Sequence, residues 1–161
     1  QMEKEKQMTT EVRTIENAEE KRRICRTILE ALPEWFGIPE AREEYISESA
    51  DKLFFAAMDG ENPVGFLYLK ETGRDTVELY VMGVLKARHR TGAGRALVEA
   101  AKWAAREAGY AFMQVKTVQM GKYAEYDATN RFYLAMGFRE FEVFPHLWDE
   151  WNPCQVYVMG L

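Results

Sequence analysis

The stretch from Thr76 to Gly109 constrains the fold of this chain most, because its hydrophobic period changes from that of a strand to that of a helix within one short segment. Apolar and other side chains alternate in TVELYVMGVL, the pattern of a strand. After the loop KARHRT, residues 95–108 carry apolar and charged side chains at helical spacing. Gly-Ala-Gly at 92–94 lies between the two patterns. The segment therefore predicts a strand that turns tightly into a helix, which is a unit of an α/β domain.

The two patterns assign side chains to faces. One face of the strand is predicted to carry Val77, Leu79 and Val81, and the other Glu78, Tyr80 and Met82. The apolar stripe of the helix is predicted to be Leu97, Ala101, Ala104 and Ala108. One face of the strand therefore carries a carboxylate.

The rest of the chain predicts further strands and helices of the same domain. Strands are expected at 12–15, 53–58, 64–70, 111–118, 138–144 and 154–159, with an Asp-Gly turn at 59–60. Helices are expected from Asn17 to Pro33 with Ile24, Ile28 and Leu32 buried, from Pro39 toward Ala50, and over 127–136 before Gly137. We expect one α/β (α+β) domain over residues 1–161, with residues 1–10 as a frayed extension.

Charge and cysteine content exclude several classes. The net charge of −5 argues against nucleic-acid binding, although it remains compatible with a polycationic substrate. The two cysteines, Cys25 and Cys154, have neither a disulfide-framework nor a zinc spacing, so no metal is expected. No apolar run is long enough to span a membrane and the first residues are charged. We expect a cytoplasmic protein that binds neither nucleic acid nor membrane.

The Gly-Ala-Gly loop is a candidate anion site. The first amides of a helix lack intrahelical partners and lie at the positive end of its dipole, so they bind phosphate oxygens. Lys86, Arg88, Arg90 and Arg95 surround the loop without a carboxylate between 86 and 95. A tight turn that packs a helix on a sheet is an equal alternative for the glycines alone. The ending of a Walker loop and the third glycine of a Rossmann fingerprint are both missing.

Two motifs together resemble the GNAT superfamily of acetyltransferases. HRTGAG at 89–94, after the strand ending MGVL, is similar to that family's pyrophosphate loop, although His89 stands where the family has Arg or Gln. NRFYLAMGF at 130–138 resembles its later motif, in which an aromatic-Tyr pair precedes Gly-Phe. The resemblance implies a mixed, largely antiparallel sheet that is splayed at the cofactor site, with helices on both faces.

The resemblance also implies acetyl-CoA as cosubstrate and a set of contacts to it. Its pantetheine arm would bond the backbone of Met82, Gly83 and Val84. Its pyrophosphate would lie on the loop and first helical turn, at His89, Arg90, Thr91, Gly92, Ala93, Gly94 and Arg95. For His89 a solvated loop position is an equal alternative.

Two residues are candidates for the acid–base chemistry of acetyl transfer. Tyr133 matches the family tyrosine that protonates the CoA sulfur, and its alternative is a packed core aromatic. Glu78 stands where several members carry a glutamate that accepts the proton of the amine, usually through water. Its alternative is an exposed or structurally paired carboxylate.

Other residues are expected near the bound substrates. Tyr126, Asn130 and Tyr133 share a helix face that should look into the cleft, and Asn130 is the candidate for a contact to coenzyme A. The acceptor loops contribute Trp35, Phe36 and Trp148, and the segment PHLWDEWNP could hold a cation by ring faces and carboxylates.

These expectations combine into one function with two alternatives. We expect an N-acetyltransferase that moves the acetyl group of acetyl-CoA to a primary amine of a small molecule by direct attack in a ternary complex, because neither cysteine lies in a nucleophile setting. A protein or peptide N-acetyltransferase and a non-catalytic CoA-binding sensor remain open. Aromatic residues near the C-terminus are compatible with a homodimer.

Overall fold

The computed structural model describes residues 10–161, so the predicted frayed extension lies outside the described residues except for Thr10. The elements are β1 (Glu11–Ile15), α1 (Ala18–Glu30), α2 (Pro39–Glu48), β2 (Leu53–Asp59), β3 (Asn62–Glu71), β4 (Thr76–Val84), α3 (Ala93–Glu107), β5 (Phe112–Val118), α4 (Ala124–Ala135), β6 (Arg139–Phe144) and β7 (Cys154–Gly160). Two short 3-10 turns cover Ser49–Asp51 and Lys86–Arg88.

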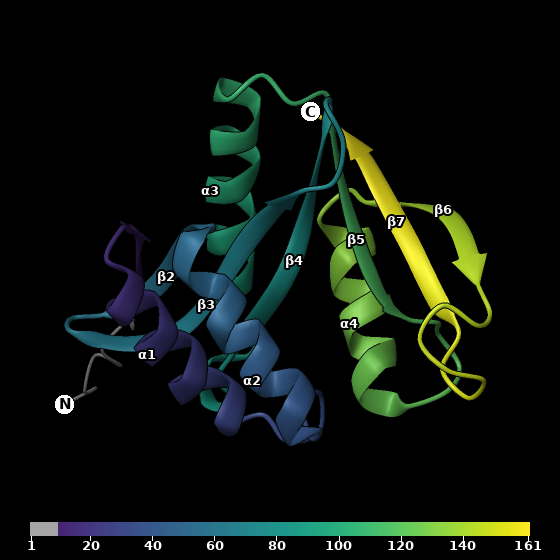
Figure 1. Ribbon diagram of the computed structural model, residues 1–161, viewed down its shortest axis with the longest axis horizontal. Helices are drawn as coiled ribbons and strands as arrows, with labels where there is room; N and C mark the ends of the chain where they lie inside the picture. The colour runs from purple at the N-terminus through teal and green to yellow at the C-terminus, as the bar shows by residue number, and fades with distance from the viewer. Residues whose placement is uncertain (1–9) are drawn as a thin grey trace, which may run out of the picture.

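Seven strands form one sheet in the order β1-β2-β3-β4-β5-β7-β6. Neighbours run antiparallel except β4 and β5, which are parallel and are joined through α3 (Figure 1). A parallel pair needs such a crossover, whereas the β2–β3 hairpin closes on Gly60, whose φ is 60°. The predicted mixed, largely antiparallel sheet is confirmed.

The helices cover both faces of the sheet, as predicted. On one face, α1 and α2 pack on β2, β3 and β4, and the predicted stripe Ile24, Ile28 and Leu32 is buried. Asn17 caps α1, since its side chain accepts the amide of Glu20 at 2.9 Å. On the opposite face, α3 and α4 form a second core with the inner residues of β4, β5 and β7.

The apolar stripe of α3 differs from the predicted one. The helix begins at Ala93 rather than Arg95, and its buried residues are Ala93, Leu97, Val98, Ala101 and Ala105. Ala108 is exposed, because it caps the helix at its C-terminal end. The stripe is therefore shifted toward the N-terminus, where the helix meets the glycine loop.

A β-bulge in β4 overturns the predicted alternation of that strand. In the pairing with β3, Leu79 lies opposite Leu69 and Val81 opposite Tyr68, so Tyr80 is an extra residue. Tyr80 and Val81 therefore both pack on the α1–α2 face. Met82 returns to the face of Leu79, so the prediction that it shares a face with Glu78 was wrong.

The bulge coincides with the end of the β4–β5 pairing. Register partners run from Thr76 and Phe112 to Leu79 and Val115, and beyond them the two strands diverge (Figure 1). The backbone of the second half of β4 is paired only on its β3 side. The predicted splay of the sheet is thereby located at Tyr80.

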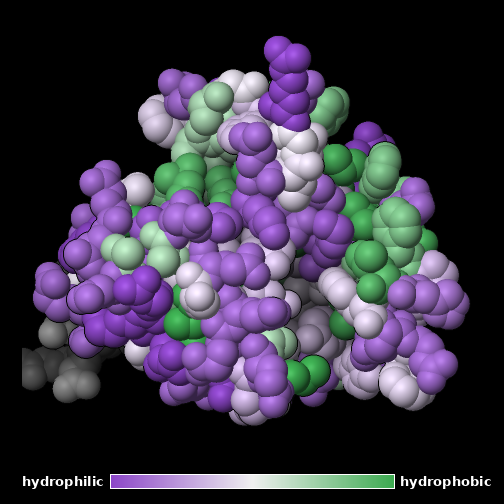
Figure 2. Space-filling view, in the orientation of Figure 1, coloured by the Kyte–Doolittle hydropathy of each residue, from purple (hydrophilic) through white to green (hydrophobic). Residues whose placement is uncertain are grey.

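Apolar side chains also reach the surface on the β6–β7 side of the molecule (Figure 2). Phe141 of β6 is 67% exposed and Trp151 in the following loop is 69% exposed. None of the helices described in residues 10–161 is both long and apolar enough to span a bilayer.

Candidate active site

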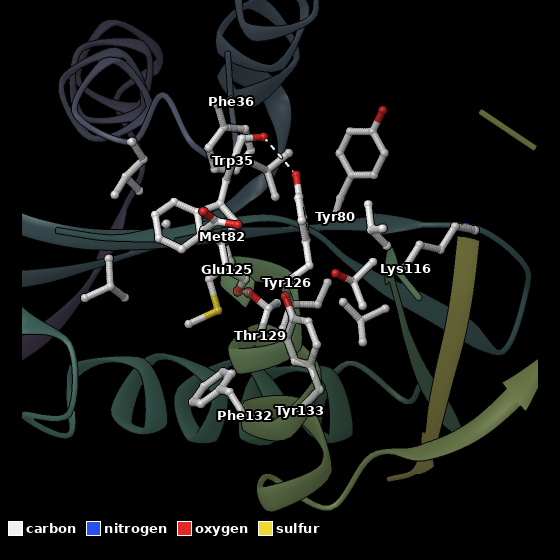
Figure 3. A pocket seen from close by; sticks show the side chains of 18 of the residues that line it. Trp35, Phe36, Tyr80, Met82, Lys116, Glu125, Tyr126, Thr129, Phe132 and Tyr133 are labelled. Atoms are coloured by element: carbon white, nitrogen blue, oxygen red, sulfur yellow. Dashed lines mark hydrogen bonds between the residues drawn. The ribbon is translucent and has the colours of Figure 1, made fainter. Parts of the chain in front are cut away.

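A pocket of about 1300 Å³ opens where β4 and β5 separate. Its wall comes from β4, β5, α4, the α1–α2 loop, the loop before α3 and the β6–β7 loop. Figure 3 shows Trp35 and Phe36 on one side of it and Phe132 and Tyr133 on the other. The sequence-predicted residues that line it are Trp35, Phe36, Glu78, Met82, Gly83, Val84, His89, Arg90, Gly92, Gly94, Arg95, Tyr126, Tyr133 and Trp148.

One end of the pocket is the glycine loop and the first turn of α3. Gly92 caps the helix with φ of 90° and without a side-chain hydrogen bond, so the first helical amides are free to bind a ligand. Arg90, with φ of 63°, also adopts a left-handed conformation that is uncommon for a residue with a side chain. A Cβ at Gly94 would lie 3.2 Å from Phe132 Cζ, so a larger side chain would fill this end of the pocket.

The cations around the loop divide into two groups. Arg88, Arg90 and Arg95 line the pocket, whereas Lys86 forms an ion pair with Glu34 and is not part of the lining. Arg88 is paired with Asp59, yet its Nη1 is buried without a partner among the described residues. Of the four cations that the sequence places around the loop, Lys86 is therefore the one that does not line the pocket.

Two residues of the predicted loop point elsewhere. The Thr91 hydroxyl donates to the carbonyl of Arg88 at 2.6 Å, which closes the turn, and Thr91 does not line the pocket. Ala93 is buried beneath the helix rather than on its ligand side. Their contribution to an anion site is limited to the backbone.

His89 has a partner within the loop. Its Nε2 lies 2.8 Å from the carbonyl oxygen of Val84, and its ring meets Trp35 edge-on with centroids 5.9 Å apart. The imidazole therefore connects the end of β4, the loop and the α1–α2 segment. His89 is at the same time an exposed loop residue, as the solvated alternative expects, so its two contacts do not exclude that alternative.

Tyr133 lies in the wall of the pocket at the centre of an aromatic group. Its ring packs against Phe132, Phe138 and Tyr157, and only 7% of the residue is exposed. Burial, with a smaller effect of Tyr126, raises the pKa of Tyr133 above its ordinary value. The hydroxyl is therefore neutral and can donate a hydrogen bond throughout the physiological range.

Glu78 is buried and paired. Only 4% of it is exposed, and one of its carboxylate oxygens accepts a hydrogen bond from Lys116 Nζ. Both residues line the pocket, so the sequence missed Lys116 as a site residue. Its signal was available, because Gln114 and Lys116 alternate with Met113 and Val115 and so define a polar face of β5.

Asn130 does not face the pocket, so the predicted common face with Tyr126 and Tyr133 is incomplete. Asn130 is 0% exposed. Its amide donates to the carbonyls of Val118 at 2.8 Å and Tyr126 at 2.7 Å, and its oxygen accepts the Tyr157 hydroxyl at 2.6 Å. These bonds use its polar atoms to join α4 to β5 and β7.

Tyr126 bridges the two sides of the pocket. Its hydroxyl donates to the carbonyl of Trp35 at 3.1 Å, which connects α4 with the α1–α2 loop (Figure 3). Trp148 of the β6–β7 loop also lines the pocket. The aromatic loops predicted for the acceptor side are thus adjacent to one cavity.

Asp149 lines the pocket, but its carboxylate is held by amides of its own loop. It accepts the backbone amides of Trp151 and Asn152, each at 2.8 Å, and the Asn152 side-chain amide. Trp151 does not line the pocket. The cation site predicted for the segment at 145–153 is therefore not formed as a unit.

The sequence was compared with models of protein families and with curated proteins. Residues 50–140, more than half of the chain, match the model of the acetyltransferase (GNAT) domain. No curated protein matches the chain.

Solved structures share the fold at low sequence identity. A protein from Desulfovibrio desulfuricans described as belonging to the GNAT family has a TM-score of 0.79 at 21% identity, over 94% of this chain and 99% of the other. The ribosomal-protein-S18-alanine N-acetyltransferase of Escherichia coli has a TM-score of 0.75 at 16% identity, over 94% of each chain. An aminoglycoside 6'-N-acetyltransferase complexed with coenzyme A has a TM-score of 0.72 at 15% identity, over 93% and 96%.

The fold, the glycine loop at the start of α3 and the family match define an acyltransferase. The chain belongs to the acetyltransferase (GNAT) family.

Proposed function

We propose that this protein is an N-acetyltransferase that transfers the acetyl group of acetyl-CoA to a primary amine of a small molecule within a ternary complex. The observation that supports it best is a single pocket that extends from the free amides of α3 to the buried carboxylate of Glu78. Tyr133 lies in the wall of the same pocket.

The residues at the loop end fit coenzyme A. Diphosphate oxygens would accept the amides of Gly92 to Arg95, with Arg90 and Arg95 nearby, and the pantetheine arm would lie along the β4 backbone from Met82 to Val84. The pocket has room here because residue 94 is a glycine. A Cβ at Gly83 would lie 2.9 Å from Ile28 Cγ2, so glycine also lets α1 pack closely. When bound, acetyl-CoA supplies a thioester that an amine can attack.

The acceptor end supplies the proton transfers. An ammonium acceptor must lose one proton to become a nucleophile and a second to become an amide. Glu78 takes the first proton, directly or through water, and passes it to solvent. Tyr133 donates its hydroxyl proton to the departing CoA sulfur. The tyrosinate is then reprotonated by the second proton that the nitrogen loses. The thioester bond breaks as the amide bond forms, so CoA leaves as a thiol.

The cysteines support direct attack rather than a covalent acyl-enzyme. Burial raises the pKa of Cys25 to about 12 and that of Cys154 to about 11. Neither thiol lines the pocket. A buried, protonated thiol away from the reacting groups is a poor nucleophile.

A protein or peptide N-acetyltransferase is the second candidate function. One solved protein of the same fold is the ribosomal-protein-S18-alanine N-acetyltransferase of Escherichia coli. The Tyr126–Trp35 hydrogen bond favours a small acceptor, because it joins two walls of the pocket where an extended chain would otherwise enter. A non-catalytic CoA-binding sensor is the third.

The test is CoA release from acetyl-CoA with a panel of amino acids, polyamines, aminoglycosides and peptides. Glu78→Gln and Tyr133→Phe should each lower kcat by about 10²-fold or more, the usual contribution of a general base or acid. Glu107→Gln and Tyr123→Phe, at exposed positions that do not line the pocket, are matched controls and should change kcat little. Tight acetyl-CoA binding without turnover on any acceptor would favour the sensor.

A further inference from the structure

The acceptor end of the pocket is built around a buried pair of opposite charges. The Glu78 side chain is 6% exposed and that of its partner Lys116 is 27% exposed, and both line the cavity. Because Lys116 is the more exposed member, its ammonium group can reach a ligand while Glu78 lies deeper. A ligand at this place meets one acid and one base side by side.

Among the other carboxylates, Glu125 at the start of α4 lines the pocket without an ion-pair partner among residues 10–161, whereas Asp149 and Glu48 are engaged. Asp149 is bound by amides of its own loop. Glu48 lies 3.7 Å from Lys70 Nζ and 3.5 Å from the Tyr80 hydroxyl. The pocket therefore offers a polycation few unpaired acids, and Lys116 would repel a second positive charge. Polyamines and aminoglycosides fit this arrangement poorly.

Further cations face the same space. Lys70 lies 4.5 Å from the centre of the Tyr80 ring and lines the pocket. Arg42 of α2 also lines it, donates to the carbonyl of Phe36 at 3.2 Å, and has a buried Nε without a partner among residues 10–161. Because Glu48 balances Lys70, Arg42 and Lys116 are the groups that favour an acceptor with a negative charge besides its amine.

The remaining wall is apolar and aromatic. Tyr45 meets Phe36 and Tyr80 edge-on, with centroids 6.2 and 5.9 Å apart. Burial and the nearby Glu48 raise the pKa of Tyr80 to about 12, so its ring carries a neutral hydroxyl. Leu147 and Trp148 add apolar surface from the β6–β7 loop. The body of the acceptor would thus contact rings and aliphatic groups.

We propose that the acceptor is an α-amino acid with an aromatic or aliphatic side chain, whose amino group binds at Glu78 and whose carboxylate binds Lys116. The proposal rests on the proposed function and names its substrate class. A zwitterion can insert head-to-tail against a buried ion pair, so that each of the four charges keeps an opposite neighbour. When an amine binds Glu78, Lys116 loses its partner carboxylate. An amine that carries no carboxylate of its own would leave Lys116 unpaired.

The test compares matched amines that differ only in the carboxylate. L-phenylalanine, L-phenylalaninamide and 2-phenylethylamine form one series, L-leucine, L-leucinamide and isoamylamine a second, and spermidine represents polycations. In at least one series, kcat/KM for the amino acid should exceed that of its amide and its decarboxylated analogue by about 10- to 100-fold, as expected for a charge-assisted hydrogen bond.

Lys116→Met should reduce this preference to less than about threefold, because the removed charge is the one that distinguishes the substrates. Any change that the substitution causes in Glu78 affects all three amines of a series and cancels in the ratio. Lys122→Met, at an exposed position in the loop before α4, is the matched control and should keep the preference. Unchanged acetyl-CoA affinity would show that the variant is folded.

Calorimetry gives a readout besides turnover. The preferred amino acid should bind the CoA-loaded wild-type protein, and its affinity should fall about tenfold or more in Lys116→Met, while that of the decarboxylated analogue stays unchanged.

The proposal is overturned if amides or peptides are acetylated as well as the amino acids, if spermidine or a simple amine is preferred, or if Lys116→Met retains the preference. In each case acetyl transfer itself stands. It is also overturned if no amino acid binds the CoA complex. Failure to bind acetyl-CoA or to acetylate any amine would instead refute the proposed function.

Discussion

The substitution Asn130→Ala tests which of two roles Asn130 has. Its position in the motif predicts a contact to coenzyme A, whereas its hydrogen bonds indicate a structural role. The residue is fully buried and donates or accepts three hydrogen bonds, to Val118, Tyr126 and Tyr157. A contact to coenzyme A would matter only when the ligand is bound. A structural role predicts a loss of stability in the ligand-free protein.

The expected loss follows from the groups left without partners. The carbonyl of Tyr126 retains the amide of residue 130 within α4, so it remains satisfied. The Val118 carbonyl and the Tyr157 hydroxyl do not, and each unsatisfied buried group costs about 1–3 kcal/mol. The free energy of unfolding should therefore fall by about 2–6 kcal/mol.

Urea unfolding of the ligand-free protein, followed by tryptophan fluorescence, measures this loss. Leu134→Ala, at a 41% exposed position of the same helix, is the control and should cost much less. In a Tyr157→Phe background the substitution should cost less than in the wild type, because one of the two groups is already gone. A loss below about 1 kcal/mol, with weakened CoA binding, would refute this reasoning.

Three further predictions concern the pocket and the core. Gly94→Val should fold but bind acetyl-CoA at least about tenfold more weakly, because its side chain enters the space in front of Phe132 and Met82. Ala96→Val, two residues along α3, is the control and should bind normally. Equal affinities of the two variants by calorimetry would contradict the placement of the cofactor. Tyr126→Phe loses the hydrogen bond to Trp35, so steady-state kinetics should show the acceptor KM raised several-fold and the acetyl-CoA KM unchanged; the reverse pattern would be evidence against the bridge. Finally, burial raises the pKa of Cys25 from 9.0 to about 12 and that of Tyr68 above 10.0, so the folded state keeps protons that the unfolded chain releases. The contribution of these two groups to the free energy of unfolding, measured in urea, should be constant below about pH 9 and should decline as the pH rises toward 12. A flat profile to pH 10.5 would disprove it.

Local patterns predicted much of the fold. Asn17, Gly60 and Gly137 act at positions where a cap or a positive φ is needed, and these requirements are set by the backbone of their own segment. The free amides at the start of α3 are equally local, because any helix start leaves them unpaired. The loop end of the candidate site was therefore readable from the sequence.

The acceptor end depends on contacts between distant segments. The bulge at Tyr80 is defined by its pairing with β3, and the alternating sequence of β4 gives no sign of it. Helical spacing put Asn130 on the face of Tyr133, but only the packing of α4 on β5 and β7 decides which residues of that face reach the pocket.

The ion pairs were also out of reach of the local patterns. Glu78 and Lys116 are 38 positions apart, and Lys86 and Glu34 are 52 apart. A sequence pattern shows that such side chains are charged and share a face, whereas the partner of each follows from the order of strands and loops. The charge available to a ligand could therefore not be deduced from counting cations near the loop.

Calorimetric titration of acetyl-CoA into the purified protein is the most direct measurement of whether the first turn of α3 holds a diphosphate. It should be run at two temperatures, since a binding enthalpy can vanish at one of them. The account predicts one site per chain, with affinity that is weakened in Gly94→Val and retained in Ala96→Val. Absence of binding heat at both temperatures would contradict it.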